Sequence, residues 1–114
     1  MNPATVLDVG AAFGDFSRTC SSHFPDAHYV LIEPLHELIP QLESSAARLV
    51  SSEIVNAVIS DSDGAQILNV HQDLVGSSIL LESEGGNING QPREVSGRSI
   101  DSIVDERNLH APYF

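Results

Sequence analysis

Basic residues, cysteine and tryptophan are scarce in this chain, and each scarcity excludes a class of protein. There is no lysine or tryptophan, and five arginines face 16 acidic residues, giving a formal net charge of −11. Such a surface repels phosphate backbones and anionic lipids, so we expect binding neither to nucleic acid nor to a membrane surface. The single Cys20 excludes an intramolecular disulfide and a multi-cysteine zinc site, and we expect no metal ion.

Long apolar runs and targeting segments are missing as well. No stretch of about 18 apolar residues exists, which argues against a transmembrane helix. The first residues lack a basic region ahead of an apolar one, so they do not predict a signal peptide. Together with the lone cysteine, these features favour a cytoplasmic protein.

The first half of the chain alternates between predicted strands and helices. Its 114 residues, 41% of them hydrophobic, suffice for one small domain or part of one. Apolar runs predict buried strands at 5–9 and 27–32, each followed by a helix, at 15–23 and at about 35–49. Pro40 interrupts the second helix and predicts a kink or a split. The expected buried stripes of the helices are Phe16, Thr19 and Cys20, and Leu35, Leu38, Ile39 and Leu42.

The second half predicts shorter elements. A third buried strand is expected at 53–59, and a helix near the end is capped by Ser99 or Asp101. Between them the sequence favours turns, loops and short strands, at 61–64, 65–70, 76–81, 84–90 and 93–96. The early alternation requires a parallel sheet covered on both faces. We therefore expect an α/β, Rossmann-like fold, in which the chain is the N-terminal part of a larger domain: a βαβαβ unit, a β-hairpin insertion and a short helix.

The segment from Val6 to Gly14 carries the clearest chemical signal, because a strand runs into a glycine-containing turn that opens a helix. Gly10 permits an unusual backbone dihedral and a close approach of a ligand to the main chain. Gly14 lies where the helix begins, which is the usual place for the polar end of a nucleotide-like cofactor. Glu33 follows Gly14 by 19 residues, at the end of the second strand, where a carboxylate can accept hydrogen bonds from ribose hydroxyls.

The turn does not suit a dinucleotide. The dinucleotide fingerprint needs G-x-G-x-x-G, but the chain has Ala12 and Asp15 at the second and third glycine positions. A pyrophosphate would also meet the carboxylates of Asp8 and Asp15. A cofactor without phosphate, such as S-adenosyl-L-methionine, suits the turn better, because Asp8 can face its ammonium group directly or through water.

These residues carry a family resemblance. The stretch Asp8-Val9-Gly10-Ala11-Ala12-Phe13-Gly14, followed by Ile32-Glu33-Pro34, resembles the opening of class I methyltransferases, and more narrowly the FkbM family. Residues 56–64 are similar to that family's A-L-S-D-x-x-G stretch, and residues 76–79 and 99–103 fall in order where it has G-x-S and T-L-D-x-L. The resemblance covers roughly residues 4–105.

The resemblance implies a seven-stranded Rossmann-like sheet and methyl transfer from S-adenosyl-L-methionine to a hydroxyl oxygen of a sugar or small natural product. It implies that the cofactor pocket is lined by Asp8, Gly10, Ala11, Gly14, Glu33 and Pro34, with Asn56 and Ala57 near the adenine. The family continues into a strand with a K-I-D-x-x-G-x-E pattern, and this chain has no lysine. We therefore expect residues 1–114 to be the cofactor-binding part of a methyltransferase domain, inactive alone, with no catalytic residue assigned.

Two other functions remain open from the sequence. The same strand–helix–strand pattern with Glu33 is compatible with a fragment of an NAD-binding Rossmann oxidoreductase, although the replaced glycines argue against it. A non-catalytic fragment or interaction module is the third hypothesis. The ligands NAD and S-adenosylhomocysteine discriminate among the three.

Overall fold

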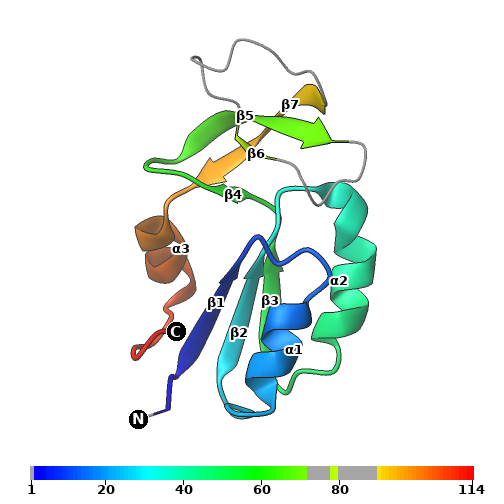
Figure 1. The fold of residues 1–114 in the computed structure, drawn as a ribbon. Helices are drawn as coiled ribbons and strands as arrows, with labels where there is room; N and C mark the ends of the chain where they lie inside the picture. Colours follow the sequence, from blue (N-terminus) through cyan, green and yellow to red (C-terminus); the bar gives the residue numbers. More distant parts are fainter. Residues whose placement is uncertain (1, 72–77, 80–89) are drawn as a thin grey trace.

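The fold consists of a three-stranded parallel sheet and a four-stranded sheet beyond the carboxyl ends of its strands (Figure 1). The computed structural model describes residues 2–71, 78–79 and 90–114. The parallel sheet has the order β1-β2-β3, with strands Thr5–Val9, His28–Ile32 and Ser52–Val55. The second sheet has the order β4-β7-β5-β6, with strands Val58–Ile59, Gly90–Arg98, Gly64–His71 and Ser78–Ile79.

The parallel sheet is buried between helices on both faces. On one face lie α1 (Asp15–Ser21) and α2 (Ile39–Ala46), whose core includes Val6, Cys20, Tyr29, Leu31 and Leu42. On the other face lies α3 (Ile100–Arg107), whose core joins Ile103 to Val30, Ile32 and Val55. Parallel strands buried on both faces read as unbroken apolar runs. This is why the predicted first two strands and the α/β architecture with a parallel sheet are confirmed.

The predicted second helix is split at its proline. A short 3-10 helix, η1 (His36–Leu38), precedes α2, and Pro40 lies in the first turn of α2. Proline is tolerated there because the first amides of a helix have no partner within the helix. The predicted buried stripe is confirmed, since Leu35, Leu38 and Leu42 are buried and Ile39 packs against the core.

The predicted stripe of the first helix is partly wrong. Cys20 is buried, but Phe16 is 48% exposed and Thr19 is exposed. The helix instead buries Ser17, whose hydroxyl donates to the Asp8 carboxylate on β1. The hydrogen-bonded pair of Ser17 and Asp8 is therefore buried between α1 and β1, on the face of the helix where the sequence pattern predicted Phe16 and Thr19. No helix in the described ranges has the length and apolar character needed to cross a lipid bilayer.

The predicted third strand is broken into β3 and β4, which belong to different sheets. The break lies at Asn56 and Ala57. The Asn56 side chain donates to the backbone carbonyls of Glu33 and Pro34, and the Ala57 amide donates to the Val55 carbonyl, two residues earlier. These bonds turn the chain away from the parallel ladder, so one apolar run serves two sheets.

The second sheet is built on the antiparallel pair β5 and β7, which are in register from Gly64–Gly97 to His71–Gly90. The predicted strand at 65–70 is confirmed, whereas the strand predicted at 93–96 extends over nine residues. The loop predicted at 84–90, apart from its last residue, and most of the strand predicted at 76–81 lie outside the described residues. The cap of α3 is Ser99, whose hydroxyl accepts the Ser102 amide, so Asp101 as the cap is wrong.

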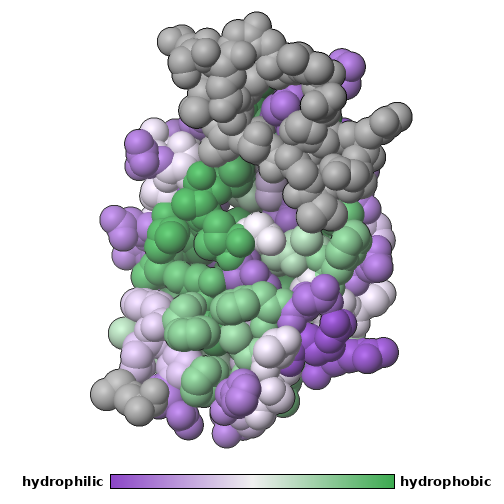
Figure 2. Space-filling view, viewed as in Figure 1, coloured by the Kyte–Doolittle hydropathy of each residue, from purple (hydrophilic) through white to green (hydrophobic). Residues whose placement is uncertain are grey.

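The last residues of the chain pair with the outer edge of β1. Tyr113 bridges Thr5 in parallel orientation, the Leu7 amide donates to the Phe114 carbonyl, and the Phe114 amide donates to the Thr5 carbonyl. The Phe114 ring stacks on Phe16, with 6.1 Å between ring centroids. Apolar side chains gather on this face of the molecule (Figure 2). The tail thereby extends the parallel sheet at the β1 side.

Candidate functional site

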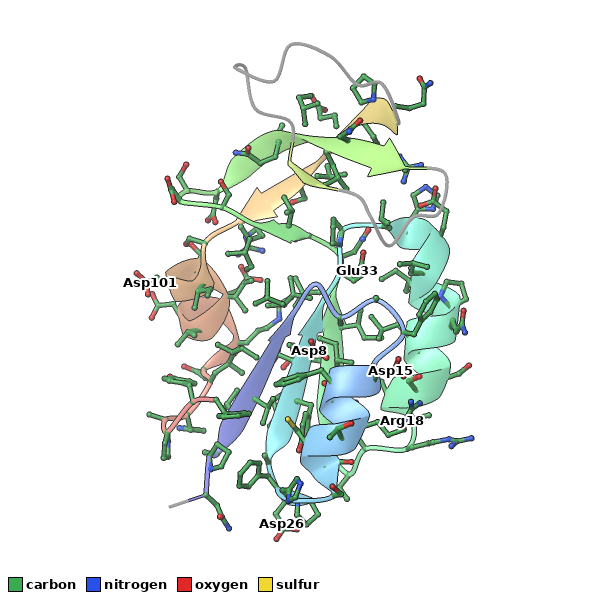
Figure 3. All side chains as sticks on the ribbon, in the orientation of Figure 1. Asp8, Asp15, Arg18, Asp26, Glu33 and Asp101 are labelled. Carbon is green, nitrogen blue, oxygen red and sulfur yellow. The ribbon has the colours of Figure 1, made fainter. Side chains whose placement is uncertain are left out.

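The carboxyl ends of the three parallel strands meet at one edge of the sheet, and three of the predicted site residues follow them. Gly10 follows β1, Glu33 follows β2 and Asn56 follows β3. Figure 3 shows Glu33 at this edge, next to the second sheet, and Asp8 lower on β1. The edge outside the carboxyl ends of parallel strands is where α/β folds bind ligands.

The loop between β1 and α1 is tightly wound. Gly10, Ala12 and Gly14 have φ values of 72°, 50° and 83°, in the left-handed region. The amides of Gly10 and Ala11 both donate to the Ile32 carbonyl, at 2.8 and 3.0 Å, and the Gly14 amide donates to the Ala11 carbonyl at 2.8 Å. A left-handed alanine is unfavourable by itself, so an interaction must hold Ala12 in place.

Glu33 supplies that interaction. Its Oε1 accepts the Ala12 amide at 2.8 Å, and its Oε2 accepts the Leu35 amide at 3.0 Å. The residue is only 4% exposed, and a buried carboxylate is tolerated when hydrogen bonds replace its water. Glu33 therefore joins the β1–α1 loop to the chain that leaves β2. Each carboxylate oxygen has a second lone pair, which can accept one more hydrogen bond.

Asp8 points away from Glu33, toward α1. Its Oδ2 accepts the Ser17 hydroxyl at 2.7 Å, and the residue is buried. Burial raises the pKa of Asp8 because it disfavours the charged form, and the hydrogen bond from Ser17 opposes part of that rise. Burial also raises the pKa of the neighbouring Cys20 thiol, and the charge of Asp8 adds to that rise.

The other predicted site residues differ in how they are placed. Asn56 and Pro34 lie at the edge, where Asn56 Nδ2 donates to the carbonyls of Glu33 and Pro34 at 2.9 and 3.1 Å. Ala11 and Ala57 are buried in the apolar cores on the two faces of the sheet. Gly14 packs against α2, since an added Cβ would lie 2.9 Å from the Ser45 Cβ. The structure thus brings Gly10, Glu33, Pro34 and Asn56 together at the edge.

Sequence reasoning missed an apolar cluster that joins the second sheet to this edge. Four of its members are buried, Leu35 and Leu38 after β2 and Leu68 and Val70 on β5. Ala12 and Phe13 of the loop and Val95 of β7 pack against them. Alternating apolar residues at 68 and 70 were a signal for a half-buried strand, but they did not indicate which surface the strand covers.

A charge pair strengthens the same contact. Arg93 on β7 donates to both carboxylate oxygens of Glu37 on η1, with Nη1–Oε1 at 2.7 Å and Nη2–Oε2 at 2.5 Å. These hydrogen bonds lower the pKa of Glu37 to about 2, and His36 nearby adds a smaller lowering effect. Both partners are 31% exposed, so solvent screens the pair in part. In the part of the chain that the structure describes, no group of His, Cys, Asp and Glu could hold a metal ion.

Comparisons with known proteins identify no relative. The chain matches no protein-family model, no curated protein and no solved structure. The resemblance to FkbM methyltransferases is therefore a prediction from the motifs, and the function has to be inferred from the geometry of the site.

The two left-handed glycines of the loop provide a matched pair of variants. Gly10→Ala and Gly14→Ala both introduce a Cβ at positive φ, which costs about 1 kcal/mol. Only Gly14→Ala also meets side chains, those of Ser45 and Leu42. We expect Gly14→Ala to lower the free energy of unfolding by about 1–3 kcal/mol more than Gly10→Ala, measured by urea denaturation. Equal losses would contradict the close packing of Gly14 on α2.

Titration tests the Glu37–Arg93 pair. A carboxylate whose pKa is lowered on folding stabilises the fold above its ordinary pKa of 4.5, and this contribution disappears as the pH falls toward 2. We expect Glu37→Gln to lower the free energy of unfolding by about 1 kcal/mol or less at pH 6. The difference from wild type should shrink between pH 4.5 and 2. Urea denaturation at several pH values measures it, and a pH-independent difference would argue against the ion pair.

Proposed function

We propose that the chain is the cofactor-binding part of an S-adenosyl-L-methionine-dependent methyltransferase that acts on a hydroxyl oxygen of a sugar or small natural product. The observation that carries the proposal is the position of the Glu33 carboxylate, at the carboxyl end of β2 and bonded to the Ala12 amide of the β1–α1 loop. A carboxylate at this point of an α/β fold suits two ribose hydroxyls. The motif series supports the same function.

The hydrogen bonds of the loop support an adenosyl ligand over a dinucleotide. A pyrophosphate needs loop amides that are free to donate to its oxygens. Here the amides of Gly10, Ala11 and Gly14 donate to backbone carbonyls, and the Ala12 amide donates to Glu33. Binding of a pyrophosphate would require these bonds to break beside the carboxylates of Asp8 and Asp15. A ligand without phosphate leaves them intact.

The residues at the edge fit such a ligand. Glu33 has one remaining acceptor position on each oxygen and would bind the ribose hydroxyls. Asp8 lies away from this edge, where its carboxylate accepts the Ser17 hydroxyl, so it would reach the ammonium group of the ligand through water. Asn56 holds the backbone beyond β2 and would border the adenine. When bound, S-adenosyl-L-methionine supplies an electrophilic methyl group on a sulfonium. No residue of the chain is assigned as the catalytic base.

An NAD-binding oxidoreductase is the second candidate, because a carboxylate at the position of Glu33 also suits the ribose of NAD. The occupied loop amides count against this candidate. A module that binds no adenosine ligand is the third possibility. Binding measurements separate all three.

Calorimetric titration of the chain with S-adenosylhomocysteine and with NAD tests the proposal. We expect S-adenosylhomocysteine to bind and NAD to compete weakly or not at all. Glu33→Gln replaces a charged acceptor by an amide that can oppose the ribose donors, so its affinity should fall about tenfold or more. Glu43→Gln, on the exposed side of α2, is the matched control and should bind as wild type.

The unfolding midpoint of each variant, measured in parallel, separates loss of a ligand contact from loss of the fold. Binding of NAD in preference to S-adenosylhomocysteine would favour the oxidoreductase. Binding of neither by the folded wild-type chain would favour the non-catalytic module.

A further inference from the structure

The second sheet lies directly over the candidate site. The two residues whose amides hold the Glu33 carboxylate, Ala12 and Leu35, belong to the apolar cluster that also contains Leu68 and Val70 of β5. Glu33 itself is 4% exposed. A ligand that donates hydrogen bonds to Glu33 must therefore reach a carboxylate that is buried beneath this contact.

The two ends of β7 are attached in different ways. At the carboxyl end of β7, Arg98 donates to Glu106 of α3 at 2.5 Å, and the amide of the following Ser99 donates to Asp63 at 2.9 Å. The chain also continues from this end directly into α3, and β4 pairs with β7 here. The end near Arg93 is tied to the parallel-sheet unit by the Glu37 pair and by the apolar cluster.

This asymmetry gives the sheet a fixed end and a releasable end. The fixed end has covalent continuity, strand pairing and ion pairs. Within residues 2–71, 78–79 and 90–114, the contacts that tie the releasable end to the parallel-sheet unit include the partly exposed Glu37–Arg93 ion pair and the apolar packing around Leu68 and Val70. Glu37 lies four residues after Glu33, so the ion pair is close in sequence to the carboxylate that the ligand needs.

We propose that the β5–β7 pair is a hinged cover over Glu33, that the Glu37–Arg93 ion pair is its latch, and that ligand access requires the latch to open. Glu37 and Arg93 are positioning residues in this scheme, since they act on the ligand only through the cover. The part of the inference that concerns the ligand rests on the proposed function. The part that concerns the latch does not.

Amide hydrogen exchange followed by NMR tests the latch without any ligand. The Ala12 amide is the reporter, because its bond to Glu33 lies under the cover. The Val30 amide, in the fully buried centre of β2, reports global unfolding. We expect Arg93→Gln to speed Ala12 exchange about threefold to fivefold and to change Val30 exchange less.

Arg98→Gln is the matched control, because it removes the ion pairs of Arg98 with Glu106 and Asp63 from the fixed end of the same strand. It should leave the ratio of Ala12 to Val30 exchange as in wild type. The double variant Glu37→Arg/Arg93→Glu keeps the pair with its charges exchanged and should restore slow Ala12 exchange. An Ala12 rate that rises only in step with Val30, or rises equally in Arg98→Gln, overturns the latch.

Stopped-flow binding of S-adenosylhomocysteine supplies the second readout. Arg93→Gln should raise the association rate constant about threefold to fivefold, and the charge-exchanged variant should return it toward wild type. An unchanged association rate in a variant with faster Ala12 exchange overturns the requirement for opening. Faster Ala12 exchange in a chain that binds no S-adenosylhomocysteine at all supports the latch and overturns the proposed function instead.

Discussion

The hydrogen bonds of the Glu33 carboxylate are the interaction on which the carboxyl edge of the sheet depends. One oxygen holds the left-handed Ala12 of the β1–α1 loop, and the other holds Leu35 at the approach to η1. Asn56 adds the end of β3 by donating to the carbonyl of the same glutamate. One buried residue thus connects the ends of three successive strands. A carboxylate buried without hydrogen-bond donors would destabilise the fold strongly, so the two amides that donate to Glu33 are held in fixed positions.

This arrangement also decides what kind of ligand the edge suits. A phosphate-binding loop leaves its amides pointing at the ligand, whereas four amides of this loop, those of Gly10, Ala11, Ala12 and Gly14, donate to the Ile32 and Ala11 carbonyls and to Glu33. What the edge offers a ligand is therefore acceptor capacity and negative charge. The ligand that we propose would supply hydroxyl donors and a cationic group to such an edge, in a chain whose whole surface has an acidic balance.

The sequence predicted the parallel-sheet unit well, and it predicted poorly the features that depend on distant partners. The first two strands and the Glu33 position follow from local signals, an apolar run and a spacing after a glycine turn. The break at Asn56 does not, because the carbonyls it binds lie 22 and 23 residues away. Arg93 and Glu37 are 56 residues apart, and no local pattern in either segment indicates that pair. The exposed Phe16 shows the same limit. The first helix turns Ser17 toward the sheet because the Ser17 hydroxyl donates to Asp8 on β1, and the sequence around Phe16 does not indicate this partner.

The few cations of the chain are concentrated where its parts meet. Arg93 joins β7 to η1, Arg98 joins the end of β7 to α3, and Arg107 joins α3 to Glu53 on β3. His28 on β2 contacts the same Glu53. The parallel sheet is held by apolar burial, which depends little on salt, while partly exposed ion pairs weaken as salt screens them. The contact between the sheets combines the apolar cluster around Leu35 and Leu68 with the Glu37–Arg93 ion pair, so only part of its stability depends on charge.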